Sequence, residues 1–405
     1  MKKINNISFG LITAAFLFAC FTPGNIWITR LENLLLPLML LALLFRSKTR
    51  IDLPIVICLG LFFTLTTITI FINQLELGKY IFGVRLLKYM ILFVLSANIL
   101  GSNLKAFDIL IKATLCLITV IVAVEAIDPL GIGSMIQSFY TPRDLEEFHV
   151  RDSFRLLGTM KNPNDSGVLL ICLAGYFISS YYYHKRPWDG IFLILCLVLI
   201  IFAQSRTALV AVVAMLVTYI VHLRTSKTMI IGLAATLLGA ALVIYFLNMN
   251  YLMELFKYNP LEISAFKGRY PAWEYMITVW HDNLIMGAGP FADKMDAYRN
   301  APDSEYIYIL AGNGIVGMVA YLCLMFAPIV VLWKRRKKSS HALLGILLPI
   351  AFLIVAITNF GILNVRLGVL YFIFLGIPFY FLLQEAKQYK WGRTLSGLDL
   401  FNKNS

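Results

Sequence analysis

Long apolar runs constrain the fold of this chain more than any other feature of its sequence. Runs of roughly 16 to 25 apolar residues recur along the whole length, and each can cross a hydrocarbon core of about 30 Å as a helix. Hydrophobic residues make up 60% of the sequence and charged residues only 14%, which is more apolar sequence than a soluble core requires. The sequence therefore predicts an all-α polytopic membrane protein.

The spacing of the apolar runs predicts about twelve transmembrane helices, with ends good to about four residues. The predicted spans are 8–24, 32–45, 51–73, 81–100, 108–127, 163–183, 188–203, 207–222, 229–248, 305–333, 342–360 and 367–383. Two segments between spans exceed the short turns of a compact bundle. The predicted organisation is helices one to five in 1–127, a first outer loop in 128–162, helices six to nine in 163–248, a large outer loop in 249–304, helices ten to twelve in 305–383, and a tail in 384–405.

The charges orient this predicted bundle. Segments on the side of the two termini carry about 19 basic and about 5 acidic residues, against about 13 and about 17 on the other side. The excess of basic residues predicts that both termini are cytoplasmic and that the long loops lie on the opposite, outer side of the membrane. The net charge of +13 is then a topology signal and does not indicate binding to nucleic acid.

Metal and nucleotide chemistry find little support in the sequence. All six cysteines fall inside predicted spans without a CxxC pair, and the five histidines are scattered without ligand spacing. No glycine-rich nucleotide motif follows a strand-like run. We therefore expect no metal and no cofactor.

Basic residues gather on the predicted outer side. Arginine presents a planar donor fork that matches phosphate oxygens, so a lipid-linked pyrophosphate at the outer interface is a natural ligand for them. The residues concerned are Arg143, Arg151, Arg155, Lys161, Arg206, Lys267, Arg269, Lys294 and Arg299. Arg206 stands between apolar runs, where a charge is costly unless it is paired or faces a polar cavity, although snorkelling at a helix end is an alternative.

Arg85 and Lys88 lie three residues apart inside the fourth predicted span, so they share one helix face near its outer end. Apolar residues at helical spacing around Trp273 predict an amphipathic helix against the membrane surface or over a cavity. Its aromatic side chains suit either an interfacial belt or a platform for sugar rings. Asp303 and Glu305 precede the tenth span, where helix capping and catalysis are both open interpretations for Asp303.

Other motif residues have simpler structural interpretations. Asn162-Pro163-Asn164 is a turn and helix-cap signal that starts the sixth span. Glycines near the tenth span are expected to permit turns and close helix packing. These are Gly287, Gly289, Gly312, Gly314 and Gly317.

Five motifs in order along the chain carry a resemblance to a known family. They are GTMKNPNDSG at Gly158–Gly167, SRTALV at Ser205–Val210, GRYPAWEYM at Gly268–Met276, LIMGAGPF at Leu284–Phe291 and DSEYIYILAGNGIVG at Asp303–Gly317. No single motif is decisive, but their order and spacing are fairly specific. Together they resemble the O-antigen ligase and polymerase superfamily, and look most like its Wzy-type polymerase branch.

The resemblance implies a bundle of the membrane glycosyltransferase (GT-C-like) type that acts on undecaprenyl-diphosphate-linked oligosaccharides at the periplasmic face, without a metal. It implies an O-antigen or other surface-polysaccharide polymerase, with a chain-length regulator and a flippase as partners in the same membrane. The catalytic candidates are Arg206, Arg269, Asp303 and Glu305. The substrate-binding candidates are Arg85, Lys88, Arg151, Arg155, Trp273, Arg299 and Tyr306.

One departure from the family pattern separates its branches. Ligases carry a histidine, a small polar residue, nine residues and then GxxG, and here Asp303 replaces that histidine with the spacing kept to Gly314 and Gly317. The replacement favours the polymerase branch and leaves the identity of a base open, with Asp303 first and Glu305 as its nearest substitute. A ligase acting on lipid A core and a polysaccharide transporter remain as alternatives.

Overall fold

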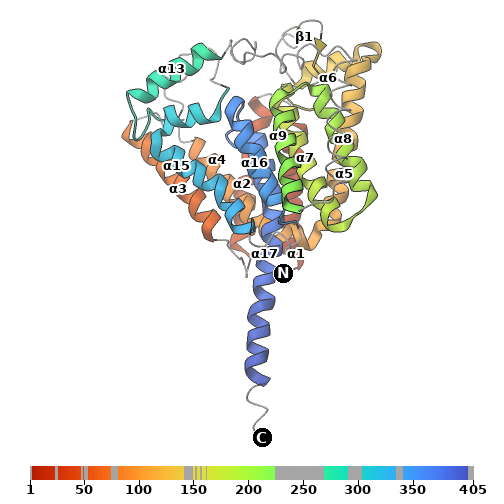
Figure 1. The fold of residues 1–405 in the computed structure, drawn as a ribbon, viewed down its shortest axis with the longest axis vertical. Coiled ribbons are helices and arrows are strands. Elements are labelled where there is room, and N and C mark those ends of the chain that lie inside the picture. The colour runs from red at the N-terminus through yellow and green to blue at the C-terminus, as the bar shows by residue number, and fades with distance from the viewer. Residues whose placement is uncertain are drawn as a thin grey trace.

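The computed structural model describes residues 2–22, 26–46, 49, 53–73, 81–140, 149–150, 153–155, 157–160, 162–223, 269–290, 303–333 and 341–399. These residues form a bundle of long helices that run between two ends (Figure 1). The start of α1 and the projecting part of α17 lie at one end, and α6, α13 and β1 lie at the other. We call the second end the outer end.

The long helices are α1 (Lys2–Phe21), α2 (Ile26–Leu44), α3 (Leu53–Ile72), α4 (Ile81–Ile99), α5 (Leu104–Ile127), α7 (Pro163–His184), α8 (Pro187–Ala203), α9 (Arg206–Leu223), α15 (Glu305–Trp333), α16 (Leu344–Thr358) and α17 (Val365–Asp399). Shorter helical elements are η2 (Leu100–Asn103), η3 (Pro129–Gly131), α6 (Ile132–Tyr140) and α13 (Tyr270–His281). Strands β1 (His149–Val150) and β2 (Ser153–Phe154) form an antiparallel hairpin in which His149 pairs with Phe154.

The prediction of a helical polytopic membrane protein is confirmed, with this small hairpin as the exception among the described residues. Six helical segments are long and apolar enough to cross a membrane, and further apolar helices are shorter. Every predicted span within the described residues overlaps one of the long helices. The predicted span 229–248 lies outside the described residues, so the total of twelve stays a prediction.

Small residues bring the central helices together. The helix α17 packs along α4, where a Cβ atom on Gly376 would lie 2.3 Å from the Cβ atom of Ser96. The aromatic rings of Phe16, Phe107 and Phe374 join α1, α5 and α17 at centroid distances of 5.4 to 6.2 Å. Close backbone approach through small residues is the usual way in which membrane helices associate, since lipid offers no hydrophobic driving force between them.

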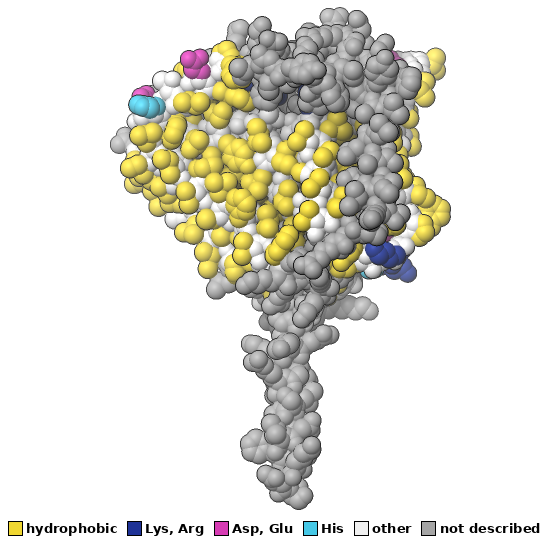
Figure 2. Space-filling model, in the orientation of Figure 1, with side chains coloured by type: hydrophobic (Ala, Val, Ile, Leu, Met, Phe, Trp, Pro, Cys, Tyr) yellow, Lys and Arg dark blue, Asp and Glu magenta, His cyan; other side chains and the backbone are white. Residues whose placement is uncertain are grey.

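Apolar side chains also cover the outside of the bundle. Figure 2 shows them across the visible face between its upper and lower margins, while the charged side chains in view lie at those margins. Large apolar residues such as Leu61, Phe71, Val120 and Ile194 are exposed on α3, α5 and α8. An exposed apolar belt of this extent is what a membrane-embedded bundle requires.

The helix α15 is broken at Gly314, whose backbone angles are φ 65° and ψ −167°. The segment Leu284–Gly289 compensates for the break: the N–H of Ala288 donates to the carbonyl of Ala311 at 2.8 Å, and Gly289 donates to Gly312 at 2.9 Å. A Cβ atom on Gly314 would lie 2.2 Å from the carbonyl oxygen of Ile285. The predicted role in turns or close packing is confirmed for Gly287, Gly289, Gly314 and Gly317, and the two motifs form one substructure.

Candidate functional site at the outer end of the bundle

The turn between α16 and α17 connects several helices at the outer end. The hydroxyl of Ser304 donates to the carbonyl of Ala356 at 3.3 Å, and the hydroxyls of Thr207 and Thr358 are hydrogen bonded to each other. The side-chain amide of Asn359 reaches a carboxylate oxygen of Asp165 on α7 at 3.5 Å. The end of α16 and the following residue thus contact α15, α9 and α7.

Glu305, the first residue of α15, binds the turn between α16 and α17. Its side chain is fully buried, and its carboxylate accepts hydrogen bonds from the backbone N–H groups of Gly361 and Leu363. The bond from Leu363 measures 3.3 Å. These bonds hold the turn in position, and the role of substitute base for Glu305 stays a prediction.

Arg269 and Asp303 form an ion pair next to that turn. The guanidinium Nε of Arg269, at the N-terminal end of α13, lies 3.2 Å from a carboxylate oxygen of Asp303. The Asp303 side chain is 52% exposed, whereas that of Arg269 is 18% exposed. Asp303 has φ 44°, a left-handed conformation that aspartate tolerates better than most residues. The pair presents an accessible carboxylate that a largely covered guanidinium holds in place.

The contacts around α15 also bear on the capping interpretation of Asp303. The carbonyl of Ser304 accepts the first helical hydrogen bond from Tyr308 at 3.0 Å, while the Ser304 hydroxyl turns to α16. The described contact of the Asp303 carboxylate is with Arg269. Helix capping is therefore not what orients the Asp303 side chain here.

Arg206 is the first residue of α9 and is buried at the outer end of the bundle. It follows Gln204, which has φ 49° and ends α8 in a left-handed turn, and Ser205, whose hydroxyl accepts the N–H of Ala208 at 3.4 Å. Gly167 lets α7 approach closely, because a Cβ atom there would lie 2.7 Å from that of Ala208. The two turns hold a buried arginine at the start of a membrane helix.

The residues that follow Arg206 and Asp303 both contact the end of α16. Thr207 follows Arg206 and touches Thr358, whereas Ser304 follows Asp303 and touches Ala356, two residues earlier on the same helix. Arg206 and Asp303 therefore flank the outer end of α16. Arg269 is linked to the same region through its ion pair with Asp303, and Glu305 binds the turn that follows α16.

Arg155 lies on the neighbouring side of the outer end. Its guanidinium donates to the carbonyl of Ala203 at 3.4 Å and to the side-chain oxygen of Asn164 at 2.9 Å. Asn164 belongs to the predicted helix-cap motif, in which the Asn162 side chain accepts the N–H of Asp165 at 2.9 Å, as the sequence predicted. Arg155 thus joins the ends of α7 and α8 and is largely buried.

Glu125 and Arg366 bind the loop Leu157–Met160, which follows Arg155, and neither residue belongs to a sequence motif. The carboxylate of Glu125 accepts the N–H groups of Leu157 and Gly158 at 2.6 and 2.7 Å. The guanidinium of Arg366 donates to the carbonyls of Thr159 and Ala19 at 2.9 Å and 2.8 Å. Both lie at the end of a predicted span and resemble ordinary flanking charges in sequence, so only their contacts distinguish them.

The remaining candidates are more dispersed. Trp273 is half-buried on α13, edge-on to Tyr270, which confirms the amphipathic helix predicted around it. The hydroxyl of Tyr306 donates to the carbonyl of Leu353 at 2.7 Å and so joins α15 to α16. On α4, Lys88 is buried inside the bundle and Arg85 is half-buried. Outside the described residues lie Arg151 and Arg299.

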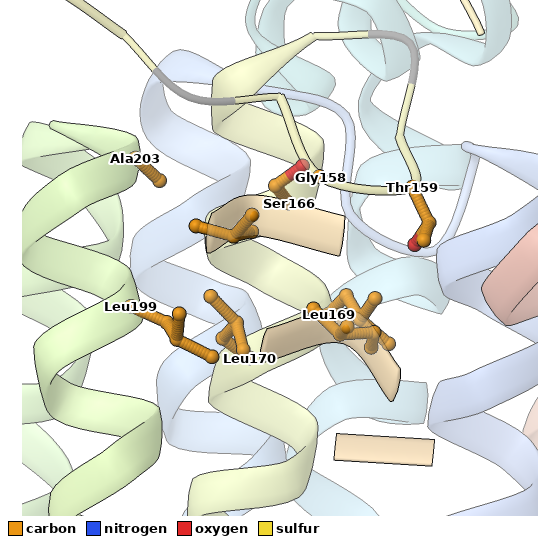
Figure 3. A pocket seen from close by; sticks show the side chains of 9 residues that line it. Gly158, Thr159, Ser166, Leu169, Leu170, Leu199 and Ala203 are labelled. Atoms are coloured by element: carbon orange, nitrogen blue, oxygen red, sulfur yellow. The ribbon is translucent and has the colours of Figure 1, made fainter. Parts of the chain in front are cut away.

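A small cavity lies beneath the loop Leu157–Met160. Its lining comes from α5, α7, α8 and this loop, with Thr159 and Ser166 above and Leu169, Leu170 and Leu199 below (Figure 3). It has room for about one water molecule, so it does not hold a sugar or a lipid chain. Within the described part of the chain, no cluster of three or more histidine, cysteine or acidic residues has the geometry to hold a metal ion.

Comparison with known proteins bears on this outer end. Residues 191–322 match the family model described as O-antigen ligase. The resemblance to the O-antigen ligase and polymerase superfamily is thereby confirmed. No curated protein matches the chain.

The O-antigen ligase match contains the residues that converge on α16. It covers Arg206, Arg269, Asp303 and Glu305, and leaves Arg155 outside. Members of the family are glycosyltransferase-like ligases and polymerases of membranes. The chain is therefore a membrane protein with a function of the O-antigen ligase or polymerase type.

Proposed function

We propose that the protein polymerises undecaprenyl-diphosphate-linked oligosaccharide repeat units at the periplasmic face of the bacterial inner membrane, with both termini in the cytoplasm. The observation that carries the proposal is the grouping of Arg206 and the Arg269–Asp303 pair around the outer end of α16. An accessible carboxylate paired with one cation, and a second cation at the start of α9, suit a diphosphate leaving group and a hydroxyl nucleophile. The product is a longer lipid-linked glycan for O-antigen or a related surface polysaccharide.

In the proposed reaction, a sugar hydroxyl of one lipid-linked repeat unit attacks the anomeric carbon of the growing chain. A new glycosidic C–O bond forms while the bond from that carbon to the diphosphate oxygen breaks, and undecaprenyl diphosphate leaves with the bonding electron pair. The hydroxyl proton passes to the Asp303 carboxylate and then to solvent. No redox partner or metal is needed for this balance.

Arg206 and Arg269 act on the leaving group. Negative charge grows on the diphosphate oxygens as the bond breaks, so cations fixed in advance stabilise the transition state more than the ground state. Arg206 is anchored by the first turn of α9, and Arg269 by its ion pair. Partial burial strengthens both interactions relative to bulk water.

Asp303 acts on the acceptor. The exposure of its carboxylate leaves it reachable by a sugar hydroxyl, and Arg269 fixes its position. An exposed ion pair adds little to stability, typically below about 1 kcal/mol, so positioning is the better explanation for the pair. Glu305 supports the site indirectly, because it holds the turn on which the site is built.

The choice of polymerase over ligase rests on Asp303 itself. It occupies the position at which the resembling ligases carry a histidine, and the rest of the spacing to Gly314 and Gly317 is kept. A ligase that transfers finished glycan to lipid A core is the second candidate, since the matched family model bears the ligase description. The same arginines would serve both reactions, because both release undecaprenyl diphosphate.

Deletion of the gene in its host separates these reactions. We expect a single repeat unit on the lipid A core in place of the ladder of long polymer on a gel, with the ladder restored by the wild-type gene. Loss of all capped core together with accumulation of lipid-linked polymer would identify a ligase. Loss of capped core without any lipid-linked polymer on the periplasmic face of the membrane would identify a transporter.

A further inference from the structure

The short helix α6 presents three different faces. At about 100° per residue, Gly133, Gln137 and Tyr140 share one side, and all three are buried. Ser134 and Ser138 lie on a second, exposed polar side. A third side carries only apolar residues, which are Ile132, Met135, Ile136 and Phe139. On that third side Met135 is 71% and Phe139 is 63% exposed.

Polar contacts fix α6 in this orientation. The amide of Gln137 donates to the carboxylate of Glu125 at 2.6 Å, and the hydroxyl of Tyr140 donates to the carbonyl of Phe21 at 3.1 Å. At its start, the carboxylate of Asp128 accepts the N–H and the hydroxyl of Ser134 at 3.0 and 2.7 Å. These bonds lower the pKa of Asp128, so it stays charged at the helix start. These bonds fix the buried side of α6 to α5 and α1, so the apolar side stays exposed.

The apolar face continues a surface that already faces lipid. The helix α5 ends at Ile127, which is 77% exposed, and α6 follows after the short η3 turn. Val120 and Leu117 are exposed on the same helix, within a segment apolar enough to cross the membrane. The α6 face thus adjoins the outer end of the lipid-facing surface of α5.

We propose that α6 is an interfacial helix whose apolar face, Ile132, Met135 and Phe139, is buried in the outer leaflet at the level of the lipid headgroups. The three faces match the three environments that meet there: protein, water and the acyl boundary. A helix that lies in the plane of the interface needs both a polar and an apolar exposed side. If protein covered the apolar face, the exposed polar side with Ser134 and Ser138 between the two other sides would not be required.

The contacts of α6 extend this placement to the candidate site. Glu125, which binds Gln137, also holds the N–H groups of Leu157 and Gly158. The loop that leads from Arg155 is therefore tied to a helix seated at headgroup depth. This inference does not depend on which glycan reaction the protein performs.

Photocrosslinking in defined vesicles tests the lipid contact. The purified full chain would carry p-benzoylphenylalanine in place of Phe139, in vesicles of phosphatidylethanolamine and phosphatidylglycerol. We expect a phospholipid adduct by mass spectrometry, at a yield comparable to that from Leu117 on α5. The matched control is Ser138 on the water side of the same helix, which should give at least five-fold less adduct.

Three outcomes would overturn the proposal. A covalent dimer from position 139 would assign the face to a second copy, and a crosslink within the chain would assign it to another segment of this protein. Equal lipid adducts from positions 138 and 139 would show no preferred face. Should the variant at 139 fail to fold, Met135 on the same face replaces it, with the same expected ratio to Ser138.

Discussion

Two charged clusters lie at opposite ends of the bundle and differ in how completely they are enclosed. At the inner end, the ammonium of Lys112 lies 2.9 Å from Asp108 and 2.8 Å from Asp189. The hydroxyl of Tyr176 donates to Asp108 at 3.0 Å, and Ser180 donates to Asp189 at 2.7 Å. We call these five residues the inner ion cluster. It joins α5, α7 and α8.

At the outer end, the carboxylate of Asp303 meets one guanidinium and is half exposed. Acidic and basic residues therefore have different roles in the two clusters. A largely covered cation shared between two buried carboxylates that have further donors is a closed network, which stabilises one packing of the helices. A half-exposed carboxylate that meets one arginine is open to a substrate, so charge alone does not distinguish a structural cluster from a reactive one.

Replacing Lys112 with methionine should produce the largest change in stability. Two buried carboxylates would then lose the ammonium that lies between them and keep only Arg186, 3.9 Å from Asp108, at a cost of about 3–5 kcal/mol. We expect less protein in the membrane and a lower unfolding temperature in detergent, but normal polymer formation per folded molecule. The double variant Asp108→Asn with Lys112→Met should recover part of the stability. Normal stability of Lys112→Met alone would contradict the structural role of the inner ion cluster.

Arg206→Ala and Arg269→Ala should act in the opposite way, on rate and not on stability. Each is expected to lose about 2–4 kcal/mol of transition-state stabilisation, or roughly 30- to 1000-fold in rate. The measurement is polymer formation from purified lipid-linked repeats, with membrane levels checked by blotting. Arg186→Ala, at the exposed edge of the inner ion cluster, is the matched control and should leave the rate unchanged. Unchanged polymer from both outer variants would remove the diphosphate assignment.

Asp303→Asn keeps the shape of the ion-pair partner but removes the basic oxygen. We expect a fall of about 100-fold in rate at saturating substrate, the low end for loss of a general base. Affinity for the lipid-linked repeat should change little, since Arg206 and Arg269 remain. A variant with normal activity would reduce Asp303 to a structural partner of Arg269.

Glu305→Gln should give the smallest effect of the series. The amide keeps an acceptor for the N–H of Gly361 or Leu363 but leaves the other N–H without one, at a cost of about 1–2 kcal/mol of stability. We expect a lower unfolding temperature and a modest decrease in rate. The rate should return to that of the wild type when both are assayed at a lower temperature. Total loss of activity with unchanged stability would instead place Glu305 in the chemistry.

The sequence predicts the helices well, because apolar length and charge asymmetry are local properties of the chain. It also marks Arg206, since a charge beside apolar runs is costly and stands out, whereas Arg269 and Asp303 are marked by the motifs that resemble the family. It does not reveal the α16–α17 turn as the meeting point, because the contacts of Thr207, Ser304 and Glu305 join segments far apart in sequence. The position of Lys88 inside the bundle likewise depends on which face of α4 meets its neighbours.

The break in α15 at Gly314 limits how this protein can be recombined with its relatives. The N–H of Ile315 donates to the carbonyl of Leu284 at 3.0 Å, so the broken helix completes its backbone pairing with a segment that precedes it in the chain. A chimera that exchanges the outer loop alone would separate donors from acceptors at the membrane boundary. Grafts that alter acceptor specificity therefore need to carry residues 269–317 as a single cassette.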